Sequence, residues 1–159
     1  MQGKKALFLF LALLLPIGIF IFLKLFGKNE FDVPAFYQDK GPVVNASCPY
    51  VYQAPYRVAD SVMTKLERQK NALYLIHFAA LGPRLKQEVD DPQISSILAT
   101  DFFRQDELNV LRNCILLVPA AQDMVVVDND GKIRGYYNSA DREEVDRLLL
   151  EFEILLKKY

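Results

Sequence analysis

The chain contains three residues whose side chains suit soft-metal or redox chemistry: Cys48, Cys114 and the only histidine, His77. Two thiolates and an imidazole would make a Cu(I) site, and the same thiols could cycle to a disulfide. Three arrangements are open: a rebuilt metal or redox site that joins all three residues, a plain disulfide, and two free thiols. The residue pattern favours free thiols, because Cys114 falls on an amphipathic stretch as a small core residue. His77 lies inside an apolar run and is more simply a satisfied core histidine.

The rest of the sequence gives little support to other chemistries. No nucleophile–base pairing, glycine-rich phosphate loop or zinc-ligand spacing is visible, so we assign no catalytic or cofactor-binding residue and predict no enzyme class. The formal net charge of −1 gives no reason to expect nucleic acid as a partner. Asp128 and Asp130 flank a turn and could hold a cation, but a solvated turn explains them more simply.

Residues 6–26 form an apolar stretch with a single charge, Lys24, and predict a transmembrane helix. At about 1.5 Å of rise per residue, the stretch matches the roughly 30 Å of a bilayer core. It is longer than the apolar part of a typical signal peptide, and no small-x-small cleavage site follows it, which favours a retained signal-anchor. We expect residues 1–5 to form a cytoplasmic tail and the bulk of the chain to be exported.

Residues 27–57 differ in character from the segments on either side. Prolines at four positions exclude a helix and remove donors from any strand. We predict an extended linker that lifts a domain at 58–159 off the membrane and can lie against its surface. A set of tyrosines near the linker and the C-terminal hairpin either packs the linker on the domain or forms a docking surface: Tyr50, Tyr52, Tyr56, Tyr136 and Tyr137.

The domain at 58–159 shows alternating helical and strand periodicity. The expected order is helix, strand, helix, strand, helix, hairpin and helix, at 58–70, 71–80, 83–89, 93–100, 106–117, 123–137 and from 141 onward. The second strand could also be a helix. Gly131 suits the hairpin turn, and Asp141 with Glu144 resembles a capping box. A strand-helix-strand unit followed by a helix, a hairpin and a packing helix predicts a thioredoxin-like α/β fold, a central sheet with flanking helices.

The segment VVVDNDGKIRGYYNSADREEVDRLL, residues 125–149, resembles the C-terminal part of the Sco/SenC family. That resemblance implies a membrane-anchored thioredoxin-like domain, in agreement with the apolar stretch at 6–26. Members of this family deliver copper to the copper site of cytochrome c oxidase, or reduce its thiols, with a Cys-x-x-x-Cys motif and a distal histidine. The close match covers about 25 to 35 residues, and elsewhere the agreement is one of layout only.

The sequence departs from the family at each of its functional positions. AALGPRL, residues 79–85, follows the first central strand and contains no cysteine. VPAAQ, residues 118–122, precedes the hairpin and contains no histidine; Ala120 stands about where the family's histidine would be. The resemblance therefore carries fold and cellular location, and none of the family's ligands.

Together these observations predict a single-pass protein of a bacterial inner membrane whose C-terminal domain is periplasmic. Its expected role is that of a non-enzymatic accessory or scaffold in respiratory oxidase assembly, with oxidase subunits or a Sco-type protein as partners. The alternative is a Cu(I)-binding or thiol-redox protein that uses Cys48 and Cys114.

Overall fold

The computed structural model describes residues 10, 12, 14–22, 24, 33–43, 48–66 and 73–157, and the chain divides into two compact units, Met1–Phe31 and Asp32–Tyr159. In the first unit, residues 14–22 are helical and exposed. Among the described residues, no helix is both long and apolar enough to span a bilayer. Much of the predicted anchor at 6–26 lies outside them, so the anchor stays a prediction.

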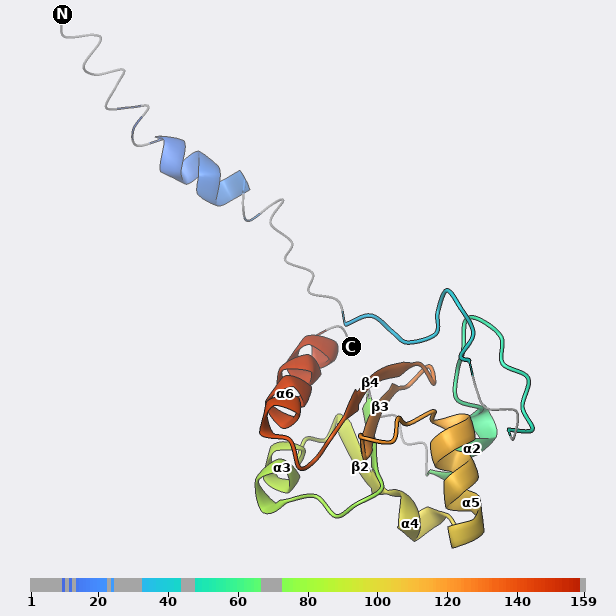
Figure 1. The fold of residues 1–159 in the computed structure, drawn as a ribbon. Coiled ribbons are helices and arrows are strands. Elements are labelled where there is room, and N and C mark those ends of the chain that lie inside the picture. Colours follow the sequence, from blue (N-terminus) through green and yellow to red (C-terminus); the bar gives the residue numbers. More distant parts are fainter. Residues whose placement is uncertain are drawn as a thin grey trace, which may run out of the picture. The chain divides into compact units, whose positions relative to one another are not determined.

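The second unit contains a four-stranded mixed sheet (Figure 1). Its strands are β1 (Leu73–His77), β2 (Ile94–Leu98), β3 (Met124–Asp128) and β4 (Ile133–Tyr137), in the spatial order β2-β1-β3-β4. β1 runs parallel to β2 and antiparallel to β3, and β3 and β4 form an antiparallel hairpin. The two central strands are buried at every position, which explains why their sequences are continuous apolar runs.

Helices cover both faces of this sheet. The helices are α2 (Asp60–Lys65), α3 (Pro83–Glu88), α4 (Ala99–Phe102), α5 (Gln105–Val110), the π-helix η1 (Leu111–Ile115) and α6 (Arg142–Leu156). Side chains of α3 and α6 pack with Leu73 and Leu75 in one core, and those of α2, α5 and η1 pack with Tyr74 and Ile76 in the other. The alternation of β1 side chains thus supplies both cores.

Most predicted elements are confirmed, with three differences. The strand predicted at 93–100 is β2, which ends at Leu98. Residues 99 and 100 begin the short helix α4, which the sequence did not indicate. The helix at 106–117 is α5 followed by a π-helical turn. Asp141 is the N-cap of α6, as expected, but the capping box is wrong: its side chain accepts from the Glu143 N–H, and the Glu144 side chain accepts from the Asn138 N–H. Residues 67–70 of the helix predicted at 58–70 lie outside the described residues.

The prediction of a solvated turn at β3–β4 holds for Asp130, which is exposed, and is wrong for Asp128. Asp128 is fully buried, and its Oδ1 accepts the backbone N–H groups of Asp130 and Lys132 at 3.0 and 2.9 Å. Its other oxygen lies 3.1 Å from Nε of Arg134, so the charge is paired. Gly131 has a φ of 78°, which requires glycine, and a Cβ there would lie 2.9 Å from Val58 O. The buried carboxylate therefore organises the turn.

The described residues of the segment 33–57, hereafter the N-terminal segment, pack on the domain. Val33 is buried, the Phe36 N–H donates to Ile133 O at 2.8 Å, and Arg134 donates to Val33 O at 3.0 Å. The compact unit accordingly begins at Asp32, ahead of the domain boundary expected at residue 58. The predicted contact of this segment with the domain surface is confirmed for its described residues.

Candidate functional site

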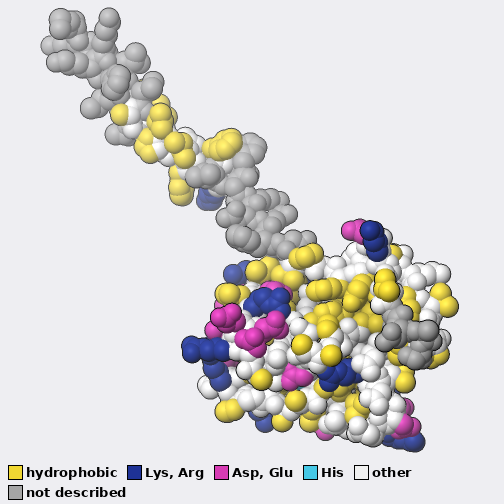
Figure 2. Space-filling model, in the orientation of Figure 1, with side chains coloured by type: hydrophobic (Ala, Val, Ile, Leu, Met, Phe, Trp, Pro, Cys, Tyr) yellow, Lys and Arg dark blue, Asp and Glu magenta, His cyan; other side chains and the backbone are white. Residues whose placement is uncertain are grey.

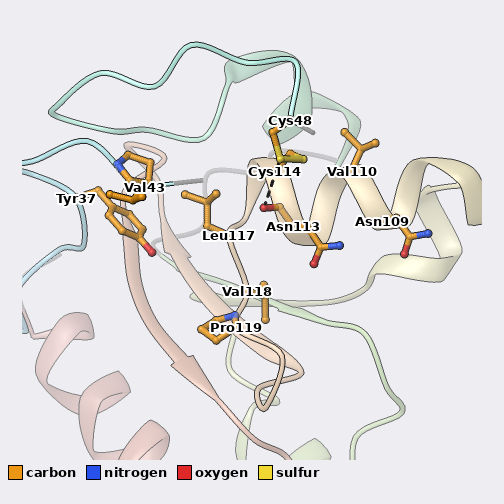
Figure 3. A pocket seen from close by; sticks show the side chains of 11 residues that line it. Tyr37, Val43, Cys48, Asn109, Val110, Asn113, Cys114, Leu117, Val118 and Pro119 are labelled. Atoms are coloured by element: carbon orange, nitrogen blue, oxygen red, sulfur yellow. Dashed lines mark hydrogen bonds between the residues drawn. A yellow bond between two sulfur atoms is a disulfide. The ribbon is translucent and has the colours of Figure 1, made fainter. Parts of the chain in front are cut away.

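Cys48 and Cys114 form a disulfide that joins the N-terminal segment to η1 (Figure 3). The prediction of two free thiols is therefore wrong, and no free cysteine remains. The sequence could not show this pairing, because it brings together residues 66 positions apart. Cys48 is half-buried and Cys114 is 7% exposed, so solvent reaches the bond from the Cys48 side.

Three tyrosine hydroxyls hold the end of η1 beside this disulfide. The hydroxyls of Tyr52, Tyr56 and Tyr136 donate to the carbonyls of three consecutive residues at 2.7, 2.6 and 2.9 Å: Cys114, Ile115 and Leu116. The last carbonyls of a helix have no partner within it, so these hydroxyls act as a C-terminal cap. Two of the three come from the N-terminal segment, which is thereby bound to η1 by hydrogen bonds as well as by the disulfide.

The tyrosine set divides into three groups. Tyr52, Tyr56 and Tyr136 cap η1, as the packing interpretation predicts. Tyr137 is buried on the other face of the sheet, where its hydroxyl donates to Glu151. Tyr50 is 47% exposed and contacts only the ring of Tyr52 among the aromatic pairs described, which leaves it available to a partner.

Burial shifts the tyrosines that cap η1 toward their neutral form. It raises the pKa of Tyr56 to about 12, and the neighbouring tyrosines add to this effect. Burial also raises the pKa of Tyr136 far above its ordinary value, and raises that of Tyr52 to a smaller degree together with Tyr50. An ionised tyrosine could not donate to a carbonyl, so the cap requires the neutral hydroxyls.

A hollow of about 630 Å³ opens beside the disulfide (Figure 3). Its described lining contains no charged side chain: Tyr37, Pro42, Val43, Cys48, Asn109, Val110, Asn113, Cys114, Leu117, Val118 and Pro119. Tyr37 and Leu117 have φ values of 57° and 56°, in the left-handed region that side chains other than glycine rarely adopt. Leu117 occupies the position after the helix end where glycine is usual, so backbone strain is retained at this hollow.

Exposed apolar side chains concentrate on the N-terminal segment. Apart from Leu150, the large hydrophobic residues exposed in the described part of the second unit are Phe36, Val43, Tyr50 and Val51, at 42%, 103%, 47% and 88%. Figure 2 shows hydrophobic side chains gathered where this segment runs and charged ones over α6. We call Phe36, Val43, Tyr50 and Val51 the apolar rim. Exposed apolar side chains on one segment are candidates for contact with a partner.

His77 does not join the two cysteines. It is 7% exposed at the end of β1, where Nδ1 lies 2.7 Å from Ala79 O and Nε2 lies 3.3 Å from the Ser96 hydroxyl. Both ring nitrogens are thus occupied, in accord with a satisfied histidine. Within the described part of the chain, no three histidine, cysteine, aspartate or glutamate side chains cluster as a metal site. Reduction of the disulfide would leave two thiolates as soft ligands and no third ligand from His77.

His77 instead lines a second hollow, of about 840 Å³, which runs along β2 from Asp91 and Ile94 to Leu98 and is bordered by α3 and the loop after β1. Ala80, Leu81 and Pro83 also line it, from the loop after β1 that would carry the cysteine motif of the Sco/SenC family.

Comparisons with protein-family models, with curated proteins and with solved structures find no match to this chain. The fold and the site define its class: a mixed α/β domain with a four-stranded sheet, flanking helices and a disulfide that fastens an N-terminal segment. The resemblance of residues 125–149 to the Sco/SenC family remains an observation on the sequence.

Two functional features escaped the sequence analysis. The cap on η1 is made by Tyr52, Tyr56 and Tyr136, which lie far apart in the chain, so no local spacing encodes it. The contact of Ser96 with His77 joins diagonal neighbours on adjacent strands, because His77 pairs in register with Leu98. Strand alternation gives a signal for this second contact, but only once β2 is known to lie parallel to β1 in this register.

Proposed function

We propose that the protein is a membrane-anchored, exported accessory of respiratory oxidase assembly, with a thioredoxin-like domain that lacks the family's cysteine pair. Residues 6–26 supply the anchor, and the domain supplies a binding surface on the periplasmic side of a bacterial inner membrane. The strand order β2-β1-β3-β4, with helices on both faces, is compatible with the thioredoxin-like arrangement.

The observation that carries the proposal is the fastened N-terminal segment with its apolar rim. A disulfide is typical of an oxidising compartment, so it supports export of the domain. The disulfide and the tyrosine cap restrict the segment before any partner arrives, which lowers the entropy that binding has to overcome. A pre-ordered surface with exposed tyrosine and valine is suited to contact with another protein.

The proposal is tested by affinity capture of the full chain, anchor included, from solubilised membranes. We expect subunits of a respiratory oxidase or a Sco-type protein to be recovered and identified by mass spectrometry. The double variant Tyr50→Ser/Val51→Ser should lower this recovery at least tenfold, because it removes two exposed apolar contacts. Both positions are on the surface, so the fold should not change.

The matched control is Leu150→Ser, which removes an exposed leucine from α6, outside the apolar rim. Its recovery of partners should equal that of the wild type. Absence of both partner classes from the wild-type sample would remove the assembly role. Equal loss in the control and in the rim variant would show that the rim is not the binding surface.

The juxtaposition of Cys48 and Cys114 favours a second candidate, a Cu(I)-binding or thiol-redox protein. Two-electron reduction of the disulfide by a dithiol gives two thiols, which are soft ligands for Cu(I). This candidate predicts stoichiometric Cu(I) uptake by the reduced protein that disappears in Cys48→Ser and in Cys114→Ser. Uptake that is unchanged in both variants excludes it.

A further inference from the structure

His77 is held in one orientation and one tautomer by its two hydrogen bonds. Ala79 O can only accept, so Nδ1 of the neutral imidazole carries the proton at 2.7 Å. Nε2 is then the acceptor, and the Ser96 hydroxyl donates to it at 3.3 Å. A backbone carbonyl thus takes the orienting part that a carboxylate has in a serine-histidine-aspartate triad.

Ser96 is accessible where His77 is not. Ser96 is exposed, His77 is 7% exposed, and both line the hollow along β2. A buried base beside an exposed hydroxyl is the arrangement that an activated nucleophile requires. The separation of 3.3 Å is slightly beyond the usual 2.6–3.2 Å, as is common in the absence of substrate.

The backbone at Ser96 supplies one donor for a developing negative charge. Leu73 donates its N–H to Gln93 O at 3.1 Å, so the polar groups of Gln93 face β1. The backbone polar groups of alternate residues in a strand point to the same side. Those of Ser95 therefore face β1, and the N–H of Ser96 points to the open edge of the sheet. β2 is the outermost strand of the described sheet, so this N–H is available to a bound oxyanion.

We propose that Ser96 and His77 form the nucleophile and general base of an ester-cleaving site. Ser96 Oγ attacks the carbonyl carbon of the ester, and its proton passes to Nε2 of His77. The carbon–oxygen bond to the alcohol then breaks, and the same proton leaves with the alcohol. Water, deprotonated by Nε2, hydrolyses the acyl-serine and restores both residues.

The lining of the hollow indicates the substrate class. Apolar side chains cover much of it: Ala80, Leu81, Val89, Ile94 and Leu98. Asp90, Asp91 and Asp101 add negative charge at the same hollow, and Lys86 is the cation in its described lining. An excess of carboxylates disfavours anionic acyl groups, so we assign the site to neutral carboxylic esters with a short apolar acyl chain.

The site is tested by labelling the purified full chain with a fluorophosphonate probe. The probe forms a bond from Ser96 Oγ to phosphorus and releases fluoride, with the serine proton taken by His77. We expect peptide mass spectrometry to find the label on Ser96, and hydrolysis of p-nitrophenyl butyrate to stop in the labelled protein. Ser96→Ala should abolish both, and His77→Gln should lower the labelling rate about 100-fold because the general base is lost.

The matched control is Ser95→Ala, which lies on the same strand with its side chain on the opposite face of the sheet. It should label and hydrolyse at the wild-type rate. Glutamine can keep both hydrogen bonds of His77, and a thermal unfolding curve checks that His77→Gln is folded. If His77→Gln is not folded, the test rests on the comparison of Ser96→Ala, at the exposed position, with Ser95→Ala. Absence of label from the folded wild type, or label that persists in Ser96→Ala, overturns the proposal.

Discussion

The two hollows of this domain differ in the charge of the side chains that line them. The hollow beside η1 is lined without charge, and a disulfide and two tyrosines hold its N-terminal segment in place. The hollow along β2 carries three aspartates and a lysine, and His77 and Ser96 are joined there by a single hydrogen bond. In the first hollow both cysteines are used in a structural bond, whereas in the second the Ser96 hydroxyl remains accessible beside a buried histidine.

This difference teaches that residue type is a poor guide to the place of chemistry in this chain. The cysteines are the most reactive residues in the sequence, yet their pairing closes a loop and fixes a surface. His77 was considered only as a metal ligand or a core histidine and Ser96 was not singled out, yet their side chains meet in the hollow along β2. The predictions below test whether the two hollows differ in this way, from the largest expected effect to the smallest.

Removal of the disulfide should produce the largest change. The double variant Cys48→Ala/Cys114→Ala should lower the free energy of unfolding by about 4 kcal/mol, the chain-entropy value for a loop closed across 66 positions. Urea unfolding of a fragment beginning at Asp32, the start of the compact unit, measures it. A reductant should lower the wild-type value equally and leave the variant unchanged. Ser96→Ala in the other hollow removes one hydrogen bond to His77 and should lower the free energy of unfolding by only about 1 kcal/mol.

High pH should lower the free energy of unfolding through the tyrosines beside the first hollow. Burial raises the pKa of Tyr56 to about 12 from an ordinary value of 10.0, so the folded state keeps a proton that the unfolded chain releases. Its contribution is complete below pH 10 and is lost as the pH rises through 12. Tyrosinate absorbance and urea midpoints should follow this loss together. Tyr56→Phe should make the stability curve less steep over that range, while Tyr136, whose pKa burial also raises, still contributes to the slope. An unchanged slope would contradict the assignment to Tyr56.

Each capping hydroxyl should contribute a smaller, separable amount. Tyr52→Phe and Tyr56→Phe each leave one carbonyl at the end of η1 without its donor, and each should lower the free energy of unfolding by about 1 kcal/mol. Tyr50→Phe is the matched control, since its exposed hydroxyl makes no described bond to η1 and should change nothing measurable. Similar values for all three variants would show that the cap does not stabilise the segment.

The strained backbone at Leu117 should give the smallest effect. Leu117→Gly removes the cost of a φ of 56°, and it also increases the entropy of the unfolded chain. We expect a net rise of about 0.5 kcal/mol in the free energy of unfolding, measured with urea. A fall of more than about 1 kcal/mol would mean that the side chain contributes to packing more than its conformation costs.

Local physical signals explain what could be predicted. The central strands are apolar throughout because both of their faces are covered, and the stripe along α6 repeats with the helical period because one face packs on the sheet. Pro83 begins α3 and Gly131 permits the turn, each by its own backbone preference. These signals act within a few residues of one another, so the order and type of the main elements were readable.

The sites depended on contacts that no local signal encodes. Whether Cys48 reaches Cys114, and whether tyrosines 52, 56 and 136 converge on one helix end, depends on how the N-terminal segment crosses the domain. Asp128 was expected in solvent, and it is buried because the turn folds its own backbone N–H groups around the carboxylate. By itself, the sequence determined the elements and their order, because hydrophobic period and turn chemistry are short-range properties. The tertiary structure alone decided which side chains meet, since pairing across tens of residues follows from sheet register and packing.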